Sequence, residues 1–161
     1  MSCVEERVRE AREEAKRLHV LGYNCAEAVL GGTVRAARGE QPPLRIATGF
    51  GGGLGRTGSV CGAVTGAIAA FGWLRGRTSP DDKETYARCA TLVRRFLADF
   101  AAAHGTMTCS ELTGYDLRDP EVLPAFAADA ARREKCARFI DTAASLAARA
   151  VLADGKGGES R

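Results

Sequence analysis

The chain has 161 residues, of which 45% are hydrophobic and 27% charged, and its formal net charge is +3. This length suits one domain, and the composition is ordinary for a soluble globular protein. So small a positive charge gives no reason to expect nucleic acid or an anionic membrane as a partner. No stretch reaches the ~20 apolar residues that span a bilayer, and residues 1–21 lack the apolar core of a signal peptide. We therefore expect a cytoplasmic protein without membrane insertion.

Apolar side chains recur at helical spacing along most of the chain, and glycine or proline separates the periodic segments. The predicted helices cover residues 2–21, 25–37, 61–74 and 80–104, and residues 44–48 suit a short helical turn. Another helix is expected to begin at residue 109. The last predicted helix covers residues 119–152 and breaks near residue 136. Three starts carry capping-box patterns: Ser2 with Glu5, Asn24 with Glu27, and Thr108 with Glu111. The apolar stripe predicted for residues 80–104 is Tyr86, Cys89, Val93, Phe96, Leu97 and Phe100.

No segment shows the two-residue alternation that is typical of strands. We expect an all-α, single-domain bundle of about five or six helices over residues 1–154, with a glycine-rich loop and a flexible tail over residues 155–161. The helix over residues 61–74 is nearly all small or apolar, so it should be buried on most sides. That much apolar surface is large for so small a domain, and it predicts a homodimer.

Four of the six cysteines fall where a helix is expected to begin: Cys25, Cys61, Cys109 and Cys136. A helix N-terminus presents backbone N–H groups and the positive end of the helix dipole. That setting favours thiolate over thiol, the form that binds metals and attacks disulfides. In a reducing compartment such cysteines are more often reduced, metal-bound or redox-active than paired in structural disulfides, which would apply only to an exported chain.

A run dense in glycine, residues 49–58, precedes Cys61. It contains G-x-G-x-x-G at residues 53–58, but the strands that a dinucleotide site needs on both sides are not predicted, and no P-loop G-K-[ST] follows. Glycine permits positive φ, so such a loop can direct several N–H groups at an anionic centre. The residues expected to surround a thiolate-ligated centre in this way are Gly51, Gly52, Gly53, Gly55 and Gly62, with Arg56 adding a positive charge.

The order of these cysteines resembles the C_GCAxxG_C_C family of putative redox-active proteins. The resemblance covers residues 21–146. Its motif consists of Cys25, then Cys61-Gly62-Ala63-Val64-Thr65-Gly66, then Cys109 and Cys136. Three flanking segments also match: Gly22-Tyr23-Asn24-Cys25-Ala26, Gly51-Gly52-Gly53-Leu54-Gly55 and Cys136-Ala137-Arg138-Phe139. It implies a redox or metal role centred on the four cysteines. Split-Soret cytochromes c are similar to this family, but the chain has no C-x-x-C-H for covalent haem.

Three interpretations of the four cysteines stay open. Four thiolates suit an Fe–S cluster, [2Fe–2S] or [4Fe–4S], or a structural zinc ion, and the redox role that the resemblance implies favours the cluster. Its negative charge would be stabilised by helix N-termini, by the glycine loop and by Arg56 or Arg138, and its electrons would go to a redox partner protein. In the second interpretation the cysteines act as dithiol–disulfide pairs without metal. In the third they only pack in the core.

The remaining cysteines and the histidines carry less signal. Cys3 and Cys89 lie outside the pattern, and we expect no function for them. His19 and His104 lie near predicted helix ends, where a dipole contact is a more common role than ligation. The sequence contains no spacing that specifies an enzymatic activity.

Overall fold

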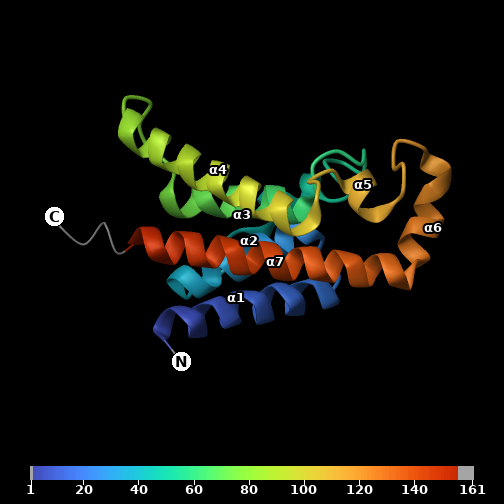
Figure 1. The fold of residues 1–161 in the computed structure, drawn as a ribbon, viewed down its shortest axis with the longest axis horizontal. Helices are drawn as coiled ribbons and strands as arrows, with labels where there is room; N and C mark the ends of the chain where they lie inside the picture. Colours follow the sequence, from blue (N-terminus) through green and yellow to red (C-terminus); the bar gives the residue numbers. More distant parts are fainter. Residues whose placement is uncertain (1, 156–161) are drawn as a thin grey trace.

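A computed structural model describes residues 2–155, and these residues fold almost entirely into helices (Figure 1). In chain order the elements are α1 (Cys3–Val20), α2 (Cys25–Arg38), the 3-10 helix η1 (Leu44–Phe50), α3 (Gly62–Arg75), α4 (Lys83–His104), α5 (Cys109–Thr113), the 3-10 helix η2 (Pro120–Val122), α6 (Leu123–Ala128) and α7 (Ala130–Asp154). The described chain contains no named strand, so the all-α prediction is confirmed. The predicted tail lies, apart from Gly155, outside the described residues.

The predicted number of five or six helices is too low, because the last predicted helix is divided. Pro120 begins only η2, and the chain is extended at Asp129, with φ −74° and ψ 106°. The Asp129 carboxylate accepts a hydrogen bond from the Arg132 N–H and so opens α7. The break therefore falls before Cys136, which lies about two turns inside α7 rather than at a helix start.

The buried centre of the molecule is α2, which packs against α1, α3 and α7. Two glycines let its neighbours approach closely. A Cβ on Gly66 of α3 would lie 2.7 Å from the Ala26 Cα, and one on Gly32 of α2 would lie 2.9 Å from the Ala15 backbone nitrogen in α1. The missing side chain at Gly66 brings the start of α2 directly against α3, and the one at Gly32 lets α1 approach α2.

The long helix α4 packs against α3 and α7 through one apolar face that includes aromatic contacts. Phe96 packs edge-on against Phe71 of α3, with ring centroids 5.6 Å apart, and lies 6.1 Å from Phe100. The predicted stripe is confirmed except at Tyr86, which is 59% exposed: Phe96 and Phe100 are buried, and the other members, Cys89, Val93 and Leu97, are half-buried against the core. Leu92 is the third buried residue of α4. Figure 1 shows the first turns of α4 lying apart from α7 while its C-terminal turns approach it.

The apolar helix α3 is covered within the same chain. It packs against α2, α4 and α7, as expected for a helix that is apolar on most sides. The surface that suggested a homodimer is therefore largely occupied by the chain itself, and the homodimer stays a prediction. Among the described residues, no helix combines the length and the apolar character needed to cross a membrane.

Candidate four-cysteine site

Cys25 is the first residue of α2, and the capping box in front of it holds that position. The Asn24 side chain accepts hydrogen bonds from the N–H groups of Ala26 and Glu27, at 2.9 and 3.0 Å. The Glu27 carboxylate in turn accepts from the Asn24 N–H at 2.9 Å and from the Thr48 hydroxyl at 2.5 Å. This predicted capping box is confirmed, and it fixes Cys25 where α2 meets the loop that follows η1.

Cys61 and Cys109 are brought together by two short antiparallel segments. The Cys61 N–H donates to the Met107 carbonyl at 2.8 Å, and the Cys109 N–H donates to the Ser59 carbonyl at 2.6 Å. Cys61 caps α3 and Cys109 is the first residue of α5. The predicted box at α5 does not form, because Glu111 accepts from the Thr106 hydroxyl instead.

All four cysteines line one cavity of about 520 Å³. Its wall also includes five of the six residues predicted to surround the centre: Gly51, Gly52, Gly55, Arg56 and Gly62. Gly53 lies behind the wall, where a Cβ would be 2.6 Å from the Cβ of Cys109. Across the described part of the chain, no three His, Cys, Asp or Glu side chains converge closely enough to hold a single metal ion.

The glycine loop has an unusual backbone. Residues 52–56 all have positive φ, including the non-glycine residues Leu54 (63°) and Arg56 (60°). The N–H of Gly55 donates to the Gly49 carbonyl at 2.8 Å, and that of Arg56 donates to the Gly51 carbonyl at 3.0 Å. These two N–H groups are therefore used in hydrogen bonds within the loop. The sequence had suggested that they would face an anion in the cavity, but they are not available for that.

Arg132 is a site residue that the sequence analysis missed. One guanidinium nitrogen lies 3.9 Å from the Cys136 sulfur, and Nε donates to the Phe126 carbonyl at 2.9 Å. The guanidinium also lies 4.1 Å from the centroid of the Phe126 ring. Arg132 and Cys136 are four residues apart on α7, a spacing that places them on one helix face. The four-residue spacing of Arg132 and Cys136 could have indicated this pairing, but Cys136 was expected to begin a helix, which would have placed Arg132 outside that helix. Arg138, the other predicted charge, lies outside the cavity wall.

The cysteines differ in their acidity. The pKa of Cys136 is lowered to about 6, first by a hydrogen bond from the Cys25 thiol and then by Arg132. The same hydrogen bond, together with burial, raises the pKa of Cys25 well above its usual value. Burial raises the pKa of Cys61 to about 11 and that of Cys109 to about 12. At the three helix starts the pKa is therefore raised rather than lowered. Burial is the chief cause at Cys61 and Cys109, and the hydrogen bond with Cys136 is the chief cause at Cys25.

The other cysteines and the histidines lie at different distances from the cavity. His19 lines it, and its Nδ1 is 3.2 Å from the Tyr23 carbonyl. His104 is not part of the wall; its ring lies between Phe100 and Phe139, and burial lowers its pKa. Cys89 is half-buried and Cys3 is exposed, both outside the cavity.

The described chain is thus a helical fold in which four cysteines far apart in the sequence line one cavity. The chain belongs to the C_GCAxxG_C_C family, described as "Putative redox-active protein", whose sequence profile matches residues 23–150. This confirms the resemblance seen in the sequence. No match was found among curated proteins or among solved structures.

Proposed function

We propose that this protein is an electron-transfer protein whose four cavity cysteines hold an Fe–S cluster. The observation that carries the proposal is the shared cavity of about 520 Å³, into which four separate segments bring one cysteine each. Four cysteine thiolates can hold either an Fe–S cluster or a zinc ion. Zinc carries no electrons, so the redox description of the family favours the cluster. When bound, such a cluster supplies one-electron transfer.

The surroundings of the cavity suit a negatively charged centre. Arg132 brings a positive charge next to Cys136, and Arg56 brings another from the glycine loop. The N–H groups of Ala63 and Val64 face the Cys61 sulfur at the start of α3 and favour its anionic form. Phe126 and Phe139 form an apolar part of the wall and limit the entry of water. The cations and the N–H groups stabilise charge on the sulfurs, whereas burial opposes it and raises the pKa of Cys61 and that of Cys109.

A second function is favoured by the contact between Cys25 and Cys136. Each cysteine is the largest cause of the other's pKa shift, which lowers the pKa of Cys136 and raises that of Cys25, so the pair would hold one thiolate and one thiol. The Cys136 thiolate would attack a substrate disulfide, form a mixed disulfide and release one substrate thiolate. Cys25, after losing its proton, would attack the Cys136 sulfur and release the second thiolate. Two electrons would thus pass from the dithiol to the substrate, leaving a Cys25–Cys136 disulfide.

A variant of Cys61 distinguishes the two proposed functions, because the cluster needs this cysteine as a ligand and the Cys25–Cys136 dithiol does not. We expect iron with matching sulfide in anaerobically purified protein and in Cys89→Ser, whose sulfur is outside the cavity. Cys61→Ser should lose both while keeping its helical circular dichroism. Zinc without iron would make the site structural. If no metal is bound and Cys61→Ser still forms the Cys25–Cys136 disulfide, the dithiol function replaces the cluster.

A further inference from the structure

A second cavity of about 280 Å³ lies between α1 and α7, beside the four-cysteine cavity. Its lining includes Lys16, His19, Val20 and Arg138. His19 lines both cavities, so the two adjoin at the C-terminal end of α1. Whatever rests on this groove is therefore next to the cysteines.

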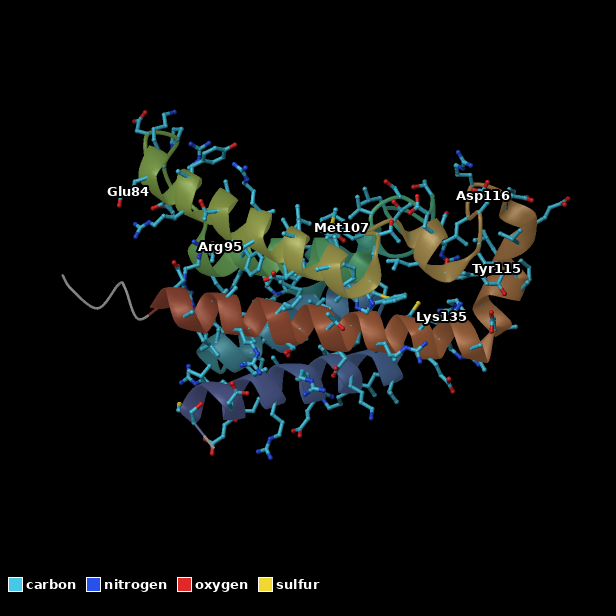
Figure 2. All side chains as sticks on the ribbon, viewed as in Figure 1. Glu84, Arg95, Met107, Tyr115, Asp116 and Lys135 are labelled. Carbon is cyan, nitrogen blue, oxygen red and sulfur yellow. The ribbon has the colours of Figure 1, made fainter. Side chains whose placement is uncertain are left out.

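The groove carries uncompensated positive charge. Arg12 is neutralised by Asp141, with its Nε 2.8 Å from the carboxylate. Within residues 2–155, neither Lys16 nor Arg138 lies at ion-pair distance from a carboxylate, although Glu134 is one turn before Arg138 on the same helix. Figure 2 shows that Lys135 extends from the same part of α7. The net charge of the whole chain is only +3, so these cations form a local positive patch on a chain that is close to neutral.

The turn from α1 to α2 adds exposed apolar surface at the same place. Val20, Leu21 and Tyr23 are 78%, 64% and 41% exposed. Val20 lines the groove, and Gly22, between the other two, lines the cysteine cavity. Exposed apolar side chains bordered by basic ones have the make-up of a protein–protein interface, with an apolar centre and a charged rim.

We propose that this face, made of Lys16, Val20, Leu21, Tyr23 and Arg138, docks an acidic electron-carrier protein. This proposal rests on the proposed electron-transfer function, and it identifies the partner protein of that function by its acidic surface. Unpaired Lys16 and Arg138 steer an acidic surface toward the cysteine end of the molecule. The apolar residues lie partly outside the groove, on open surface that a flat protein can cover and a small anion cannot.

Docking is tested by binding, which does not require an intact redox centre. The probe is a plant-type ferredoxin, an acidic carrier, titrated at low ionic strength against the full-length protein with and without its metal. We expect Lys16→Glu/Arg138→Glu to bind about tenfold more weakly, because rim charges govern encounter. The matched control is Arg94→Glu/Arg95→Glu, which makes the same change in net charge at exposed positions of α4, where Figure 2 shows Arg95. Leu21→Ser should also weaken binding.

The outcomes separate cleanly. Loss of affinity in the groove variant and in Leu21→Ser, with an unchanged control, supports docking at this face. Equal loss in both charge variants, tighter binding of basic cytochrome c, or no binding by the wild type overturns it. An unchanged Leu21→Ser would overturn the interface in favour of simple anion attraction. If ferredoxin binds as expected but exchanges no electrons, docking holds and the electron-transfer function fails.

Discussion

Arg132 and Cys136 share one face of α7, and this spacing adds a cation to the Cys25 hydrogen bond that is the first cause of the lowered pKa of Cys136. The guanidinium is held by the Phe126 carbonyl at 2.9 Å and by the Phe126 ring, so its charge stays beside the sulfur. A fixed cation together with a donated hydrogen bond stabilises a thiolate even in a partly buried site. The pKa of Cys136 is accordingly lowered, while the pKa of Cys61 and that of Cys109 are raised by burial.

In protein prepared without metal, we expect iodoacetamide to modify Cys136 faster than the other cavity cysteines. Thiolate is the reacting form and accumulates as pH rises through the pKa, so the rate should increase with a midpoint near pH 6, from the Cys136 pKa of about 6. Arg132→Gln should move the midpoint upward, and Arg133→Gln should not. Peptide mass spectrometry across pH measures this, and an unmoved midpoint in Arg132→Gln would contradict the assigned role.

The crossing of α2 and α3 depends on the absence of a side chain at Gly66. A Cβ there would lie 2.7 Å from the Ala26 Cα and close to other Ala26 backbone atoms, none of which can rotate away. Because Ala26 follows Cys25 and Gly66 is in the helix that Cys61 caps, this crossing also sets how the two cysteines lie.

We expect Gly66→Ala to lower the free energy of unfolding by about 1–3 kcal/mol, the usual effect of overpacking. Gly72→Ala on the same helix is the matched control, since a Cβ there meets nothing within 4 Å. Better helix propensity should leave that variant equally stable or up to ~1 kcal/mol more stable. Urea unfolding followed by circular dichroism compares the two, and equal stabilities would contradict the close packing.

Stability is unevenly distributed over the whole molecule. Ten residues of α2 are buried, whereas α4 is longer and buries only three, none of them before Leu92. Few buried contacts mean that local opening requires little free energy. The first turns of α4 should therefore open without unfolding the bundle.

Native-state hydrogen exchange followed by mass spectrometry tests this difference. Amides of residues 83–90 should exchange much faster than those of α2, which should open only on global unfolding. Phe96→Ala, which removes the ring packed against Phe71, should extend fast exchange over the rest of α4. Similar protection in both helices would show that α4 is held by more than its aromatic contacts.

Local signals in the chain were enough for much of this architecture. The Asn24–Glu27 box and Gly105, which ends α4 with φ 80°, act within a few residues, so their effects follow from sequence. The expectations at Thr108 and near Cys136 failed because other contacts compete. Glu111 bonds to Thr106 instead of completing the box, and Thr108 lies in the bridge with Val60. Asp129, which caps the start of α7, also accepts from the Tyr115 hydroxyl.

The sequence by itself determined the helical class, the family and the four cysteines, because periodicity, capping residues and motif order are properties of neighbouring residues. Only the tertiary structure decided that all four cysteines line one cavity, that Cys25 meets Cys136, and that Arg132 rather than Arg138 stands beside a sulfur. It also decided which thiol has a lowered pKa. Burial and through-space charge set a pKa, and both arise only when segments far apart in the chain are packed together.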